Sequence, residues 1–169
     1  MPSDQPLRTA LLAKVNEQIE RTNHLIALLP ADTSQWEPAV HGARAVDRLL
    51  GHLLECLAGM CAALAAAEPE RLAHFLALRD LPVNHSCSAE EAIRRIDTYR
   101  VHIDEGFALL TDADLARPIP TVFVKQGEPL LTLLLGNLEH LINHKHELFT
   151  CLKHMKVGVK SSDLYRFRT

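Results

Sequence analysis

Apolar residues recur at three- and four-residue steps in four long segments of the chain, which is the spacing of amphipathic helices. The first predicted helix covers residues 7–29 and stops at Pro30. The second covers residues 43–67, and its alanine-rich end predicts a closely packed neighbour. A third helix is predicted to begin after Ser88, which forms a capping-box pattern with Glu91.

The apolar stripe of the third helix includes Phe107 and either Val101 or Ile103. The fourth helix is predicted to open at Pro129 and to continue until Gly158, with apolar positions at Leu130, Leu134, Leu138, Leu141, Leu148, Phe149 and Leu152. Before it lies TDADLARPIPTVFVKQGEP, with three prolines and a β-branched patch at residues 122–124, which predicts a long connection containing a short hairpin. The segment EPERLAHFLALRD predicts a short additional helical turn after the second helix.

These elements predict an all-α four-helix bundle that forms a single domain over residues 1–169, with a long connection before the last helix. A length of 169 residues with 47% hydrophobic side chains is sufficient for one core. No internal repeat, low-complexity tract or linker divides the chain. Trp36 is expected to pack at the corner between the first two helices.

The charge balance and the cysteines narrow the class of protein further. Eighteen basic against 21 acidic side chains leave a net charge of −3, which disfavours binding to nucleic acid or to an anionic membrane surface. The N-terminal segment resembles no signal peptide, and no continuous run reaches the roughly 18 apolar residues of a membrane span. The cysteines form no CxxC pair, as expected of free thiols in the cytoplasm: Cys56, Cys61, Cys87 and Cys151.

The composition is unusual in its high number of histidines, of which the chain has ten. His140 and His144 are four residues apart in the fourth helix, so their side chains share one face at a Cβ separation of about 5–6 Å and can chelate one metal ion. His52, beside the apolar stripe of the second helix, is the candidate for a third ligand. Three neutral imidazoles would leave open coordination positions for a water or a substrate.

Structural interpretations of the same residues remain open at this point. Such a histidine pair can also be two half-exposed residues at the edge of a bundle, and His146 can be a solvated side chain. Cys56, one turn after His52, is expected to be a small buried residue rather than a ligand. The other histidines are expected at the surface or at the core edge: His24, His41, His74, His85, His102 and His154. A di-iron site is disfavoured because no Glu is followed three residues later by His.

Three strings resemble the DinB/YfiT-like superfamily. LEHLINHKHELFTCLKHMKVGVKSSDLYRF is similar to the last helix and tail of that family, with matching spacing at His140, His144, Leu148, Leu152, Lys153, Gly158, Leu164 and Tyr165. WEPAVHGARAVDRLLGHLLE resembles its Trp-x-Pro corner followed by a helix with one histidine, here His52. The segment TDADLARPIP resembles the connection before its last helix.

The resemblance implies a bundle in up-down-down-up order, often assembled as a homodimer. It also implies one divalent metal bound by His52, His140 and His144, for which three imidazoles suit zinc or nickel, with iron as an alternative. The chain departs from the family where Lys145, His146 and Glu147 replace the usual Arg-Gly-Gln, and where Asn143 precedes His144.

Members of the superfamily include transferases that use a low-molecular-weight thiol such as bacillithiol, mycothiol or glutathione. The first hypothesis is therefore a metal-dependent thiol S-transferase of detoxification or stress response, acting on a small molecule with the thiol as cosubstrate. A bound divalent metal would stabilise the thiolate, so no nucleophile from the protein is needed.

Two alternatives compete with this hypothesis. A metal-dependent hydrolase would activate a bound water, with Glu55, Glu139 or Glu147 as the base and Glu147 as the catalytic candidate close to the metal face. A non-enzymatic stress or partner-binding bundle would instead seal its metal from solvent. Asn137, three residues before His140, shares its helix face and is a candidate to orient it.

Overall fold

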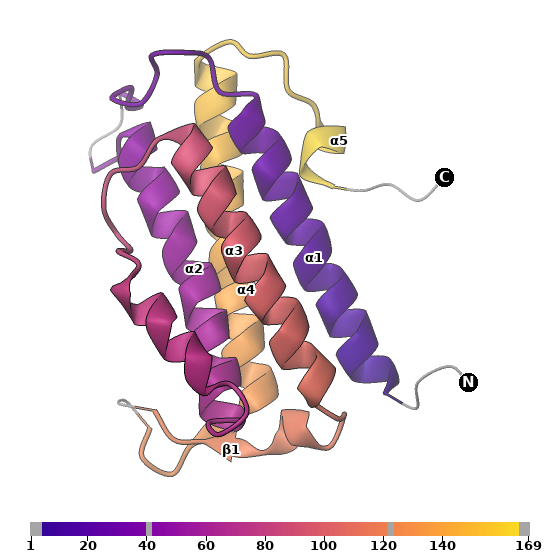
Figure 1. The fold of residues 1–169 in the computed structure, drawn as a ribbon. Helices are drawn as coiled ribbons and strands as arrows, with labels where there is room; N and C mark the ends of the chain where they lie inside the picture. Colours follow the sequence, from indigo (N-terminus) through magenta and orange to yellow (C-terminus); the bar gives the residue numbers. More distant parts are fainter. Residues whose placement is uncertain (1–4, 40–41, 122–123, 166–169) are drawn as a thin grey trace.

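The computed structural model describes residues 5–39, 42–121 and 124–165, and its core is a bundle of long helices (Figure 1). The four long helices are α1 (Pro6–Ala27), α2 (Val46–Ala67), α3 (Ala89–Leu109) and α4 (Leu130–His154). Along the bundle axis α1 and α4 run in one direction, and α2 and α3 run in the other (Figure 1). The prediction of an all-α four-helix bundle is confirmed, and the order of the helices is up-down-down-up.

Several predicted helix boundaries need correction by a few residues. The second helix begins at Val46 rather than at residue 43, because Ala45 is extended and Val46 donates its backbone N–H to the Trp36 carbonyl at 2.9 Å. The fourth helix ends at His154, before Gly158. Ser88 is the N-cap of α3 as predicted, since its hydroxyl accepts the Glu91 backbone N–H at 3.1 Å. The predicted capping box is only half formed among the described residues, because the Glu91 carboxylate lies 3.6 Å from Arg95 Nη1.

The early end of α4 has a clear backbone cause. Lys156 takes a left-handed conformation with φ of 63°. Its N–H bonds to the Lys153 carbonyl at 3.0 Å, and the Val157 N–H reaches back to the Leu152 carbonyl at 2.9 Å. This pair of bonds is a Schellman motif, which satisfies the last carbonyls of the helix with a lysine where glycine is more usual.

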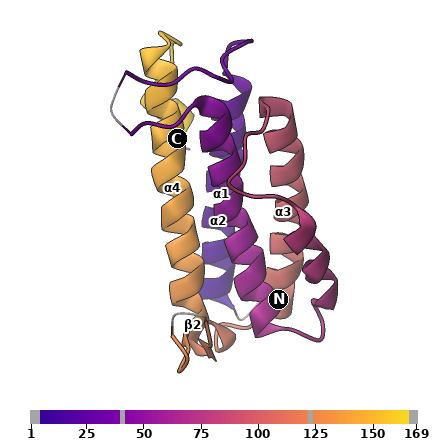
Figure 2. The same cartoon turned by 90° about the vertical axis from the view of Figure 1, so that its left-hand side faces the viewer.

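The long crossover of the bundle connects α2 to α3. Residues 68–88 return along the outside of α2 so that α3 can run parallel to it (Figures 1 and 2). The predicted extra helical turn is present in this segment as the 3-10 helix η1 (Ala73–Asp80). The helix α2 packs against both α3 and α4, and α1 packs against the same two helices from the other side.

The connection between α3 and α4 closes one end of the bundle. It contains the 3-10 turn η2 (Asp114–Ala116) and a hairpin in which β1 (Pro118–Ile119) pairs antiparallel with β2 (Glu128–Pro129). The predicted hairpin is confirmed, but its strands flank the β-branched patch. Of that patch, residues 122 and 123 lie outside the described part of the chain, and Val124 accepts the Gly127 N–H at 3.0 Å in a turn.

The core lies between the facing apolar stripes of the four helices. In α3 the ambiguity of the stripe resolves in favour of Ile103, which is buried, whereas Val101 is 65% exposed. Trp36 is half-buried against the core at the corner between α1 and α2, as expected. By length and composition α2 is apolar enough to cross a membrane, yet 61% of its apolar window is buried within the bundle, as in the core helix of a folded domain.

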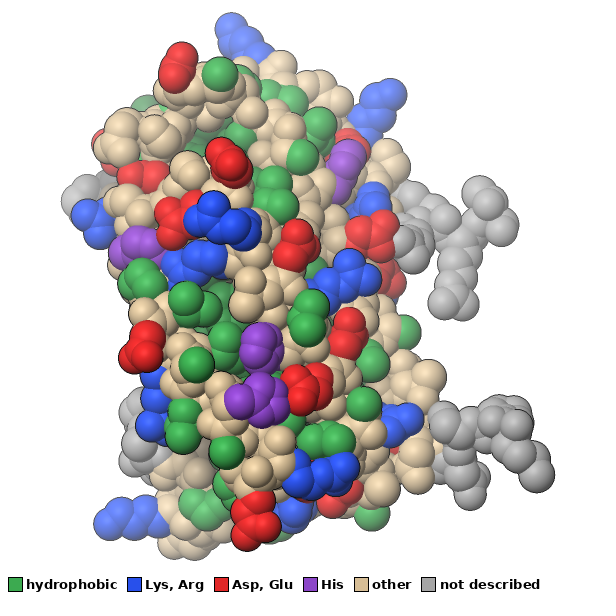
Figure 3. All heavy atoms as spheres, viewed as in Figure 1, with side chains coloured by type: hydrophobic (Ala, Val, Ile, Leu, Met, Phe, Trp, Pro, Cys, Tyr) green, Lys and Arg blue, Asp and Glu red, His purple; other side chains and the backbone are tan. Residues whose placement is uncertain are grey.

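The surface over α1 and α3 carries acidic and basic side chains interspersed (Figure 3).

Towards the C-terminus the short helix α5 (Ser161–Leu164) is held against α1, where Asp163 pairs with His24 at 2.8 Å. The buried Lys145 of α4 donates from Nζ to Gln18 Oε1 at 2.5 Å and to the Leu164 carbonyl at 2.9 Å. Burial lowers the pKa of Lys145 to about 8.

The loop that precedes α3 approaches α2 very closely at Gly51. A Cβ atom on Gly51 would lie 1.6 Å from the backbone oxygen of His85, so only glycine fits there. The Gly51 carbonyl accepts the Asn84 N–H at 3.1 Å, and Asn84 is itself left-handed with φ of 57°. The buried Arg95 of α3 also donates to the Pro82 carbonyl. These contacts place Asn84 directly beside His52.

We predict opposite effects for two glycine-to-alanine substitutions in helices. Gly51→Ala should lower the free energy of unfolding by about 1–3 kcal/mol, because the clash with His85 outweighs the gain in helix propensity. Gly136→Ala in α4, whose Cβ would meet nothing within 4 Å, should raise it by up to about 1 kcal/mol. Denaturant unfolding of both variants checks this, and a stabilised Gly51→Ala would contradict the close approach.

Candidate metal centre

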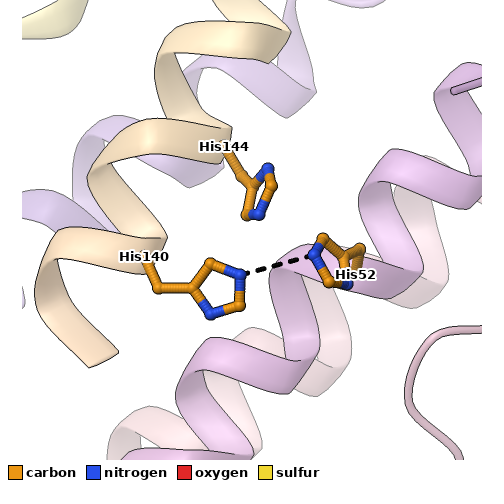
Figure 4. A group of neighbouring side chains, drawn as sticks. All are labelled: His52, His140 and His144. Atoms are coloured by element: carbon orange, nitrogen blue, oxygen red, sulfur yellow. Dashed lines mark hydrogen bonds between the residues drawn. The ribbon is translucent and has the colours of Figure 1, made fainter. Parts of the chain in front are cut away.

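Three histidines from two helices converge on one point in the bundle. His52 comes from α2, and His140 and His144 come from adjacent turns of α4, with their rings facing one another (Figure 4). One ring nitrogen from each lies within 4.8 Å of the other two. These three residues are the set predicted from the sequence, and the structure brings all of them together.

The distances between the rings fit a single metal ion. His52 Nε2 and His140 Nε2 are 3.3 Å apart (Figure 4). Two nitrogen ligands bound at about 2.0–2.1 Å to one tetrahedral ion would be separated by about 3.3 Å. The centroid of the His144 ring lies 4.4 Å from that of His52 and 4.7 Å from that of His140. The donor set therefore suits one divalent transition metal with three imidazole ligands.

Hydrogen bonds to Nδ1 of His52 direct its other nitrogen, Nε2, towards His140. Its Nδ1 contacts Asn84 Oδ1 and also lies 3.0 Å from Glu55 Oε2. Because both partners present acceptor oxygens, Nδ1 carries the hydrogen and Nε2 keeps its lone pair. Asn84 was missed by the sequence analysis, since it lies in a loop 32 residues further along the chain without a local motif.

Glu147 orients His144 in the same way. Its Oε2 accepts a hydrogen bond from His144 Nδ1 at 2.9 Å, and the Nη1 of Arg44 lies 3.7 Å from the same oxygen. Burial lowers the pKa of His144, although the bond to Glu147 opposes this effect. At neutral pH the ring therefore favours the uncharged form that binds a metal.

The other residues considered in the sequence lie outside the cluster. His146 is exposed on a neighbouring face of α4. Glu139 is also exposed, and Asn137 donates to the Leu133 carbonyl at 2.9 Å instead of contacting His140. The remaining histidines of the described chain are exposed or half-buried, as expected, and His41 lies outside the described residues.

The four cysteines are all free and buried. Burial raises the pKa of Cys56 and of Cys61 to about 12, and that of Cys87 and Cys151 to about 11. Cys56 packs in the core with Sγ 3.9 Å from the His52 carbonyl oxygen. All four thiols thus stay protonated near neutral pH and are poor nucleophiles.

The centre is partly accessible from outside. The side chains of His52 and His144 are 18% and 13% exposed. His52 forms part of the wall of an open hollow of about 630 Å³, together with Arg44, Arg48 and Asn84. A small molecule in the hollow could therefore reach His52, which distinguishes this centre from one sealed in the core.

Comparison with known proteins establishes the fold. No protein-family model matches the sequence, and no curated protein matches it either. The structure is similar to the crystal structure of a DinB-like protein from Bacillus subtilis, with a TM-score of 0.64 and 18% identity, covering 87% of this chain and 92% of that one. The chain therefore has a DinB-like fold, and its three-histidine cluster could hold a metal ion.

We predict about one divalent transition metal per chain in the purified, tag-free protein. His144→Ala or His140→Ala should lose the metal and keep most of the helix signal, because the apolar core is independent of the rings. His146→Ala is the matched control and should keep its metal. Elemental analysis with circular dichroism checks this, and loss of metal in the control alone would refute the assigned pair.

Glu147→Ala should weaken metal binding about 10- to 100-fold, because His144 would lose the acceptor that fixes its tautomer. The neighbouring exposed carboxylate provides the control, and Glu139→Ala should bind metal as the parent does. Competition with a chromophoric chelator measures both affinities. Equal affinities in the two variants would show that Glu147 does not position His144.

Proposed function

We propose that this protein is a metal-dependent thiol S-transferase whose metal is held by His52, His140 and His144. The observation that carries the proposal is an accessible three-imidazole centre with ring nitrogens directed at one point. A divalent ion bound there would lower the pKa of a coordinated thiol, so that the thiol reacts as a thiolate at neutral pH.

The chain's own residues support this use of the centre. The imidazoles are neutral ligands, so they leave the positive charge of a bound ion uncompensated. Asn84 and Glu147 fix the orientation of two of the rings. The four buried cysteines, with raised pKa values, make a nucleophile supplied by the protein unfavourable, so the reactive sulfur is assigned to a small cosubstrate.

Of the carboxylates considered as bases for a hydrolase, two are bonded to the histidines and one does not contact them. Glu147 and Glu55 each contact the outer nitrogen of a histidine, a role that orients a ligand. Glu139 is exposed and, among the described residues, has no hydrogen bond or ion pair with the cluster. These positions favour the transferase over a hydrolase. A cytoplasmic location, a zinc or nickel ion and a homodimer remain part of the proposal.

The test uses cobalt(II) as a spectroscopic metal. Adding 2-mercaptoethanol to the cobalt-loaded protein should produce a thiolate-to-cobalt charge-transfer band in the near ultraviolet. The band should be absent in His52→Ala and present in the control His146→Ala. Transfer of glutathione, bacillithiol or mycothiol to an electrophilic fluorogenic acceptor then measures turnover.

The alternatives have distinguishable outcomes. Ester or amide hydrolysis that depends on His144, with no charge-transfer band from any thiol, would favour the hydrolase. A bound metal with neither thiol binding nor turnover would favour a non-enzymatic metal protein. Either result would refute the transferase.

A further inference from the structure

The hollow that reaches His52 carries two arginines on its wall. Arg44 and Arg48 line it together with His52, and the acidic residue Glu37 also lies on the wall. Arg48 is in the first turn of α2, four residues before His52, so the two side chains lie on one face of the helix with Cβ atoms about 5–6 Å apart. The two cationic groups and one of the three candidate ligands, His52, thus share one accessible space.

The guanidinium groups are available to a ligand. Arg48 is exposed, and its guanidinium has no hydrogen-bond or ion-pair partner among the described residues. Arg44 is 44% exposed, and its contact with Glu147 is a loose one at 3.7 Å. Glu37 is exposed as well and forms no ion pair with either arginine within the described part of the chain. Both arginines therefore leave most of their donors directed at solvent or at the hollow.

We propose that Arg44 and Arg48 bind a carboxylate of the molecule whose sulfur occupies the three-histidine centre. This inference rests on the proposed thiol function and specifies the chemical class of its cosubstrate. Guanidinium groups bind carboxylates through paired, charge-assisted hydrogen bonds. Because Arg48 and His52 are one helical turn apart, the carboxylate lies only a few bonds from the sulfur, which selects a compact mercapto-carboxylate over an uncharged thiol.

Two thiols that differ in one charged group test the proposal. The cobalt-loaded protein is titrated with 3-mercaptopropionate and with 2-mercaptoethanol, and the charge-transfer band gives each Kd. The parent protein should bind 3-mercaptopropionate about 10- to 100-fold more tightly than the combined Arg44→Gln, Arg48→Gln variant does, the range expected for lost hydrogen bonds to a charged group. The Kd for 2-mercaptoethanol should stay the same in both.

Arg100→Gln is the matched control, because Arg100 is exposed on α3 and does not line the hollow. It should leave both affinities unchanged. Circular dichroism and metal content show that each variant folds and loads. Raising the salt concentration should weaken only the binding of 3-mercaptopropionate, and only where both arginines are present.

Calorimetric titration with succinate, which has no thiol, separates the two proposals. Succinate binding that the double variant loses, without a band from either thiol, would refute the thiol function and retain the anion site. Thiol binding with the same preference in the parent and in the double variant would refute the anion site and retain the thiol function. If no thiol binds and succinate binding is indifferent to the arginines, both proposals are wrong.

Discussion

The candidate centre depends on how closely α2 and α4 approach each other. Two turns beyond His52, a Cβ atom on Gly59 would lie 2.1 Å from Asn137 Oδ1 of α4, so the absence of a side chain permits the contact. At this separation His52 Nε2 comes within 3.3 Å of His140 Nε2. An alanine at Gly59 would require the Asn137 side chain to move, because its amide fills the space that the glycine leaves between the two helices.

The centre combines two opposing requirements. Burial favours the neutral form of His144 that binds a metal, yet the centre must remain reachable for a ligand. The lowered pKa of His144 reflects the first requirement, and the hollow beside His52 reflects the second. Position at the edge of the core reconciles them, because His52 and His144 are mostly buried while Asn84 and Glu147 hold their outer nitrogens. The crossover between α2 and α3 contributes Asn84, so it forms part of the centre.

The residues around the ligands were harder to predict than the ligands themselves. Asn137 was expected to support His140 because it shares its helix face, but its side chain bonds within α4 and fills the space left by Gly59. Glu147 was considered as a base, and its bond to His144 favours a positioning role. No sequence motif marked Asn84 as a partner of His52. Its location depends on the close approach of its loop to α2, which the glycine at position 51 permits and which the hydrophobic pattern does not predict.

By itself the sequence determined the helices and the pairing of His140 with His144, because both follow from the 3.6-residue period of a single helix. It also limited the third ligand to the stripe of α2. The tertiary structure decided the contact between His52 and His140, which are 88 residues apart in the chain. It also decided where α4 ends, at His154, and where Asn84, Arg44 and Arg48 lie relative to His52. These features depend on which helix faces meet and how closely their backbones approach, and packing in three dimensions decides both.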